Sequence, residues 1–285
     1  MTGTEAALFW GFLLVYGVVM YVLSPESRNA ASFYRGADDS GKPVGQWSLT
    51  ASIFISWIFA KSVTNAANLG ATYGVTGGLA YASYWLSIPV AGYIIYLIRT
   101  QTGARSLQEF LTTRFGRLAS LSFAAAILIR LYNEVWSNTA VVGGYFGDVG
   151  EWPYYTAAMV FTAFTLAYSL KGGLRSSIFT DVIQAVVFVF FLAAVLFLII
   201  PANDFVAVFI FSLVGVHAQL NGIAAAGNAP AAVGQSLGLT ALFLMSVIMM
   251  TSAGSTLDST FNSFAKSIAV DLPKLARRAK DRLPS

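Results

Sequence analysis

The stretch Leu49–Tyr73 reads LTASIFISWIFAKSVTNAANLGATY, and it decides how the rest of the chain is interpreted. It begins and ends as an apolar run, but its middle, Ala60–Asn65, is polar and contains Lys61. A charged side chain at membrane depth is costly and usually faces a bundle interior or a water-filled cavity. Broken helices near the membrane midplane hold the binding sites of secondary transporters. The stretch therefore predicts a broken membrane helix that lines a polar site.

The composition predicts an integral membrane protein. Of 285 residues, 56% are hydrophobic and only 11% are charged, with a mean hydropathy of +0.68. A soluble domain carries about 25% charged residues. The net charge of +4 comes from basic residues in short loops beside apolar runs, so it indicates no nucleic-acid partner. The chain has no cysteine and one histidine, His217, and no catalytic cluster is evident, so we expect no enzyme.

The apolar runs predict an all-α, polytopic membrane protein with one transmembrane domain over residues 1–285. Seven spans are expected, at residues 7–23, 46–71 (the broken one), 79–98, 118–146, 154–170, 176–200 and 237–270. Gly74, Gly77 and Gly78 are expected to form a tight turn after the broken span. The interval 203–235 is too short or too polar for a span and is expected to be interfacial or re-entrant. Residues 271–285 are expected to form a basic cytoplasmic tail.

The distribution of charge orients the chain. Basic residues concentrate in the loops that follow the first, third and fifth expected spans, and in the tail. Because basic loops stay on the cytoplasmic side, we expect the N-terminus outside and the C-terminus in the cytoplasm. The expected location is a plasma membrane of the bacterial type.

Three short motifs add a resemblance. They are SFYRG at Ser32–Gly36, GGLRSSIFTDVIQ at Gly172–Gln184 and STLDS at Ser255–Ser259. Together they resemble motifs of the sodium:solute symporter family. That resemblance implies a LeuT-like helix bundle of two inverted five-helix repeats. The first repeat would be complete and the second incomplete, so the chain resembles a shortened or partial member whose bundle other chains could complete.

The resemblance also implies a sodium site, because the family binds this ion between its first broken helix and the STxDS helix. Hard cations take oxygen ligands. Carried over by motif, the ligands are the backbone carbonyls of Ala51, Phe54 and Ser252 and the hydroxyls of Ser255 and Thr256. On spacing alone, close helix packing is the favoured role of these small hydroxyl residues, and the resemblance reverses that preference.

Further residues are candidates for the ion path and the solute cavity. The resemblance makes Asp181 an acid on the ion path, although it also suits a helix N-terminus. Lys61, Asn65, Asn68, Gln184 and Asp258 are candidates for the cavity. Lys61 is expected to pair with Asp258 or Glu134, or to bind an anionic solute and replace or modulate the sodium ion.

The predicted function is sodium-coupled symport of a small polar or anionic solute by alternating access across a lipid bilayer. One alternative is a membrane sensor or regulatory module with a symporter-like fold. Another is a truncated relative without transport. Sodium-dependent stabilisation would distinguish an ion-binding protein from a relic.

Overall fold

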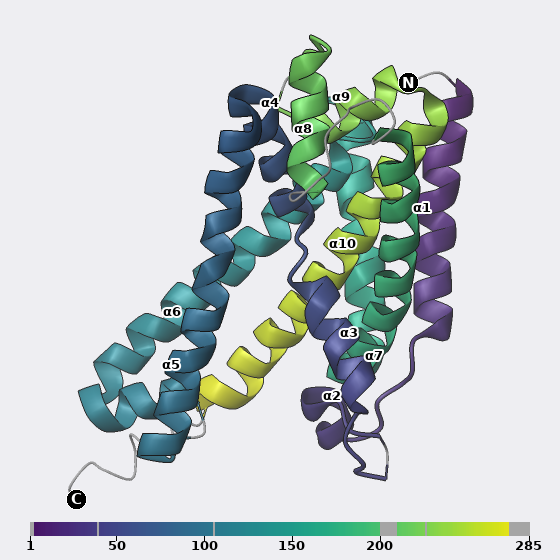
Figure 1. The fold of residues 1–285 in the computed structure, drawn as a ribbon. Helices are drawn as coiled ribbons and strands as arrows, with labels where there is room; N and C mark the ends of the chain where they lie inside the picture. The colour runs from purple at the N-terminus through teal and green to yellow at the C-terminus, as the bar shows by residue number, and fades with distance from the viewer. Residues whose placement is uncertain (1–2, 39, 105, 200–209, 226, 274–285) are drawn as a thin grey trace, which may run out of the picture. The chain divides into compact units, whose positions relative to one another are not determined.

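The computed structural model describes residues 3–38, 40–104, 106–199, 210–225 and 227–273, which form helices and connecting turns (Figure 1). The helices are α1 (Gly3–Leu23), α2 (Ala30–Arg35), α3 (Gln46–Ser56), α4 (Ala60–Ser83), α5 (Ser87–Thr102), α6 (Leu107–Gly143), α7 (Trp152–Ile199), α8 (Ile210–Leu220), α9 (Ala229–Ser236) and α10 (Leu239–Lys266). A 3-10 turn at Tyr84–Leu86 precedes α5, and a π-helical turn at Ser267–Asp271 follows α10. The predicted all-α class is confirmed.

Four helical segments in the described part of the chain are long and apolar enough to cross a membrane. They are Gly3–Leu23, Leu107–Gly143, Trp152–Val195 and Leu239–Asp271. Helices of this length in an apolar chain are typical of a multi-pass membrane protein. The expected basic tail lies outside the described residues from position 274 onward, and so does the start of the interval 203–235, up to residue 209.

The chain divides into two compact units. Unit 1 comprises Met1–Tyr81 and Glu134–Asn262, and unit 2 comprises Ala82–Asn133 and Ser263–Ser285. Within unit 2, α6 bends at Gly116, where φ is +85°. The candidate site described below lies entirely in unit 1.

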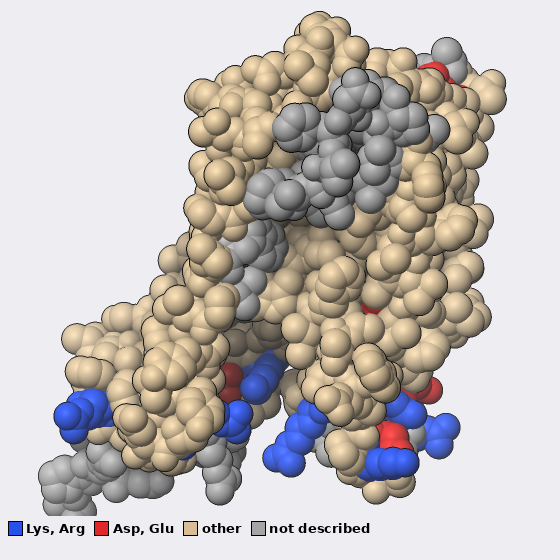
Figure 2. Space-filling model, viewed as in Figure 1, with Lys and Arg blue, Asp and Glu red and all other residues tan. Residues whose placement is uncertain are grey.

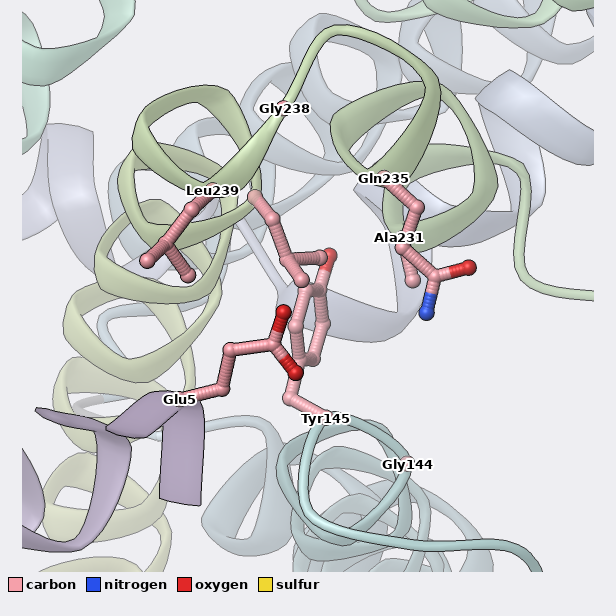
Figure 3. Close-up of a pocket in the computed structure, with 8 residues that line it drawn as sticks. Glu5, Gly144, Tyr145, Ala231, Gln235, Gly238 and Leu239 are labelled. Carbon is pink, nitrogen blue, oxygen red and sulfur yellow. The ribbon is translucent and has the colours of Figure 1, made fainter. Parts of the chain in front are cut away.

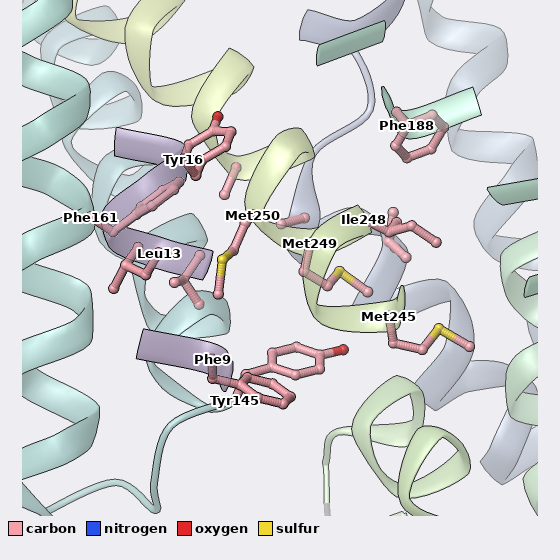
Figure 4. Close-up of a cluster of buried hydrophobic side chains, with 14 of the residues drawn as sticks. Phe9, Leu13, Tyr16, Tyr145, Phe161, Phe188, Met245, Ile248, Met249 and Met250 are labelled. Carbon is pink, nitrogen blue, oxygen red and sulfur yellow. The ribbon is translucent and has the colours of Figure 1, made fainter. Parts of the chain in front are cut away.

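The core of unit 1 is formed by apolar and aromatic side chains from α1, α7 and α10 (Figure 4). Tyr16 on α1 stacks on Phe161 of α7, with 6.1 Å between the ring centroids. Phe9 contacts Phe146 edge to face at 6.0 Å. Met249 on α10 is fully buried in the same cluster. Offset and edge-to-face ring pairs stabilise a core beyond the area that they bury.

The broken helix is present, but the break precedes the polar run. Helix α3 ends at Ser56 and α4 begins at Ala60, so the polar residues form the first turns of α4. At the break, the Ser252 hydroxyl of α10 donates a hydrogen bond to the Ile58 carbonyl. A backbone carbonyl freed from a helix inside a membrane needs such a partner. The break is therefore supported by a side chain from a distant helix, without a glycine or proline in the linker.

The glycines after the polar turns of α4 do not form the tight turn that was expected. Within α4, Gly74 leaves the helical conformation, with φ +63° and ψ −149°, and the helix resumes after it as far as Ser83. Gly77 and Gly78 are buried inside the second part of α4. Since residues other than glycine rarely adopt this φ, Gly74 permits a kink without ending the helix.

The glycine pair of the GGLRSS motif bends α7. Gly173 has φ +57° at this bend, and the loop after α1 packs against it. A Cβ added to Gly172 would overlap the Pro25 carbonyl oxygen, and one added to Gly173 would lie 2.5 Å from the Phe33 carbonyl oxygen. The Ser27 hydroxyl donates to the Gly172 carbonyl at 2.5 Å. The two glycines therefore have a conformational role: they allow the bend in α7 and the close approach of the backbone at Pro25 and Phe33.

Basic side chains gather at the end of unit 1 where α2 lies (Figure 2). Beside the bend of α7, the Lys171 ammonium donates to the Tyr21 carbonyl at 2.9 Å. The Arg175 guanidinium donates to the Glu26 carbonyl at 3.5 Å. These two side chains bond the bend of α7 to the last turn of α1 and to the loop that follows it.

The close backbone approach at the bend predicts a specific sensitivity. Gly172→Ala should lower the free energy of unfolding by about 1–3 kcal/mol, because the added methyl group forces two backbones apart. The matched control is Gly11→Ala on α1, where an added Cβ meets no atom of the described residues within 4 Å. Thermal unfolding in detergent checks both variants, and equal stability of the two would contradict this account of the motif.

Candidate functional site

Asp181 lies at the centre of a buried polar cluster. Its side chain is fully buried on α7, six residues after Arg175 of the bend motif. The hydroxyls of Ser52 and Ser56 on α3 donate to Asp181 Oδ2 at 2.5 and 3.3 Å. The Ser255 hydroxyl of α10 donates to Asp181 Oδ1 at 2.5 Å. This single side chain on α7 therefore joins α3 to α10 through hydrogen bonds.

A second buried carboxylate, Asp258, lies in the same region of α10. The Ser177 hydroxyl donates to Asp258 Oδ1 at 2.6 Å, and the Thr180 hydroxyl donates to Oδ2 at 3.0 Å. Both donors lie on α7, and Asp258 is fully buried. Asp258 thus bonds hydroxyl groups where pairing with Lys61 was expected.

Serine hydroxyls connect the two carboxylates. Ser56 lies 3.2 Å from Ser255 and 3.1 Å from Ser259, measured between hydroxyl oxygens. Ser259 in turn donates to Asp258 at 3.4 Å. We call this group the carboxylate cluster; its members are Ser52, Ser56, Ser177, Thr180, Asp181, Ser255, Asp258 and Ser259.

In their ionised form, the two carboxylates of the cluster favour a cation. In the part of the chain that the structure describes, the contacts of Asp181 and Asp258 are to hydroxyl groups and to no lysine or arginine. Hydroxyl donors compensate part of the cost of burying a carboxylate, but they do not neutralise its charge. A cation among these oxygens would do so.

The carbonyls expected to bind sodium lie on α3, the helix that bonds to Asp181. Phe54 is among the last four residues of α3, whose carbonyls lack partners within a regular helix. The backbone N–H groups of Trp57 and Ile58 bond to the carbonyls of Ile53 and Ile55. Ala51 lies about one turn before Phe54 on the same helix.

The expected ligands on α10 have different partners. Ser255 bonds to Asp181, as described above. The Thr256 hydroxyl donates to the Ser252 carbonyl at 3.0 Å, so two of the expected ligands contact each other. Ser252 uses its hydroxyl at the break, on the Ile58 carbonyl.

Lys61 is half-buried in the first turn of α4. Its backbone N–H donates to Asn138 Oδ1 at 3.3 Å, and the Asn138 amide donates to Glu134 Oε2 at 3.1 Å. Asn138 therefore connects the backbone of Lys61 to the side chain of the expected partner Glu134.

The three amide candidates are used differently. Asn68 donates to the Gly227 carbonyl at 2.6 Å and accepts from the Ala229 N–H at 2.8 Å, so its amide fixes the start of α9. Gln184 is fully buried and donates to the Tyr16 hydroxyl at 2.7 Å. Asn65 is half-buried on α4.

Sequence reasoning missed five members of the cluster. They are Ser52, Ser56, Ser177, Thr180 and Ser259. One signal was available, because Ser52 and Ser56 are four residues apart and Ser177 and Asp181 share the same spacing, which places each pair on one helix face. Which faces meet depends on tertiary packing.

Comparison with known proteins gives a family and several relatives. A model of the sodium:solute symporter family matches residues 39–210. Sodium/glucose cotransporter 1 of Ovis aries is 26% identical over 184 residues, which is 62% of this chain and 26% of the relative. The Homo sapiens sodium/myo-inositol cotransporter is 25% identical over 184 residues, 62% of this chain and 25% of the relative. The matched part of the chain thus spans about a quarter of the length of these relatives.

A solved structure shares the fold. It is a substrate-bound, outward-open Na⁺-coupled sialic acid symporter, with a TM-score of 0.65 and 15% sequence identity. The match covers 99% of this chain and 75% of that one. The predicted LeuT-like helix bundle is confirmed at the level of the fold.

The matched family is a family of transporters, which agrees with the expectation that the chain is not an enzyme. The resemblance carried by the three motifs is confirmed, because the family match covers more than half of the chain. The chain therefore belongs to the sodium:solute symporter family.

Proposed function

We propose that this chain contributes the ion-binding core of a sodium-coupled symporter that moves a small polar solute by alternating access. The observation that carries the proposal is the buried Asp181 carboxylate, which accepts hydrogen bonds from both α3 and α10. Helix α3 ends at the break that separates it from α4, so the carboxylate holds one half of the broken helix. Family membership and the transporter names of the relatives support the same function.

The donor set suits sodium. Sodium is a hard cation, and such cations take oxygen ligands from carboxylates, hydroxyls and backbone carbonyls. We propose the carbonyls of Ala51, Phe54 and Ser252 and the hydroxyls of Ser255 and Thr256 as the ligands, with Asp181 on the ion path. Support comes from the helix-end carbonyl of Phe54 and from Ser255, which bonds directly to Asp181.

Ion binding is coupled to helix position through the charge of the cluster. A buried carboxylate without a countercharge destabilises the packed arrangement of α3, α7 and α10, whereas a bound cation stabilises it. An ion that binds one arrangement better than another shifts the population toward it. Sodium entry and release would therefore bias the position of α3.

Lys61 is proposed to face the solute. It stands in the first turn of α4, where the helix dipole also favours negative charge. A solute that carries a carboxylate would compensate both. The relatives named above include sodium/glucose and sodium/myo-inositol cotransporters, and the solved neighbour is a sialic acid symporter. These names support a small hydroxylated solute, with or without an acidic group.

The proposed orientation places the N-terminus outside. Lys171 and Arg175 lie at the bend of α7 with the loop that precedes α2, and basic side chains cluster at that end of unit 1 (Figure 2). Basic groups favour the cytoplasmic face. The bend of α7 is therefore proposed to be cytoplasmic.

The sodium site is tested with the double variant Ser255→Ala and Thr256→Ala. Sodium-dependent thermal stabilisation of the purified chain should be lost, because two proposed ligands are removed. Thr251→Ala is the control, since the Thr251 hydroxyl is buried on α10 and bonds to the Val247 and Ile248 carbonyls of its own helix. Unchanged sodium stabilisation in the double variant would refute the ligand assignment.

The role of Lys61 is tested with Lys61→Met, which keeps most of the apolar stem. Sodium stabilisation should persist, while binding of an anionic solute such as sialic acid should weaken about tenfold or more, as the loss of one charged hydrogen bond predicts. Binding is measured by calorimetry at fixed sodium. A large gain in sodium affinity would instead show that Lys61 competes with the ion.

A further inference from the structure

Basic side chains are concentrated at particular helix ends. At the end of unit 1 where α1 begins, the residues that line a cavity of about 230 Å³ include Glu5 and, in the described part of the chain, no lysine or arginine (Figure 3). Basic side chains gather at the end of unit 1 where α2 lies and, within unit 2, where α5 ends and α6 begins (Figure 2). The group in unit 2 takes no part in the proposed ion site.

Helix α6 begins with a short segment that a bend sets apart. Gly116 forms the bend with φ +85°, a conformation that other residues rarely adopt. The Ser120 hydroxyl donates to the Gln108 carbonyl at 3.5 Å, whereas a straight helix would hold these two residues about 18 Å apart. The second part of α6 therefore turns back beside the first, and Leu107–Phe115 is a separate short helix within unit 2.

The bend exposes two arginines and two large apolar side chains. Arg114 and Arg117 flank Gly116, and both are exposed. Neither guanidinium has a hydrogen bond or an ion pair with any described residue. Phe115 is 64% exposed and Leu118 is 79% exposed. We call Arg114, Phe115, Arg117 and Leu118 the arginine corner; it presents cations and apolar groups side by side.

The surroundings of the arginine corner are also basic. Arg99 lies in the last turn of α5, is exposed, and has no ion pair with the described residues. Residues 103–106 join α5 to α6, so Arg99 adds a further cation at this end of unit 2. From Arg99 to Arg117 the sequence contains four arginines and one acid, Glu109. Such an excess of cations attracts an anionic partner.

The apolar half of the corner identifies the kind of anion. A soluble anion would satisfy the arginines and leave Phe115 and Leu118 in water, whereas a phospholipid offers a phosphate and an acyl chain together. Guanidinium groups bind phosphate through two parallel hydrogen bonds. Anionic lipids attract basic segments to the cytoplasmic leaflet, where this loop is expected to lie. We propose that the arginine corner binds anionic phospholipids, with Arg114 and Arg117 on the headgroup phosphates and the two apolar side chains among the acyl chains.

The proposal is tested by titrating phosphatidylglycerol into the purified chain in a neutral detergent, with phosphatidylcholine as the reference lipid. Phosphatidylglycerol should raise the unfolding temperature saturably, and potassium chloride should weaken the effect by screening. The double variant Arg114→Gln and Arg117→Gln should weaken the apparent affinity about tenfold or more. The control is Arg28→Gln with Lys42→Gln, which removes the same charge from exposed positions of unit 1 and should leave the affinity unchanged.

Two further measurements separate a lipid site from a general charge effect. Phe115→Ser with Leu118→Ser keeps both arginines and should weaken the affinity for phosphatidylglycerol several-fold, because the acyl chains lose their contacts. A cooperative thermal transition without added lipid reports that each variant is folded. Equal stabilisation by phosphatidylglycerol and phosphatidylcholine, or an equal loss of affinity in the arginine and control variants, would overturn the proposal. Stabilisation by glycerol phosphate as large as that by phosphatidylglycerol would overturn it in favour of a site for free phosphate.

Discussion

The packing of the broken helix depends on one buried carboxylate. Asp181 accepts hydrogen bonds from Ser52 and Ser56 on α3 and from Ser255 on α10, so three helices meet through one side chain. In a membrane interior, hydroxyls on opposing helices are among the few groups that can satisfy such an acid. The serines that face one another on α3, α7 and α10 meet this requirement.

Close backbone contacts at the bend of α7 and at the break between α3 and α4 also position these helices. The glycine pair at the bend of α7 admits the loop after α1, and the bend directs the Ser177–Gln184 segment into the bundle. The break between α3 and α4 is likewise supported from outside, by the Ser252 hydroxyl. Short polar contacts and small residues therefore contribute to the geometry around the cluster, beside buried apolar side chains such as Ile55 and Leu257.

The sequence was sufficient for the class of protein and for the existence of the broken helix, and it singled out Asp181. Apolar length and the motif around Gly172 carry that information locally. The exact break could not be predicted, because a serine on α10 stabilises it across a long interval of sequence. The partners of Asp258 were also out of reach, since charge complementarity favoured Lys61 while packing placed Ser177 and Thr180 beside it.

The two halves of the broken helix are anchored by different kinds of contact. Asn68 fixes α4 to the start of α9 through neutral amide hydrogen bonds, whereas α3 is held through hydroxyls bonded to a carboxylate. The strength of a hydrogen bond to a carboxylate depends on the charge of that carboxylate, whereas a bond between neutral groups has no such dependence. The linker at residues 57–59 thus joins an arm held by neutral amide contacts to an arm whose contacts depend on the charge of Asp181.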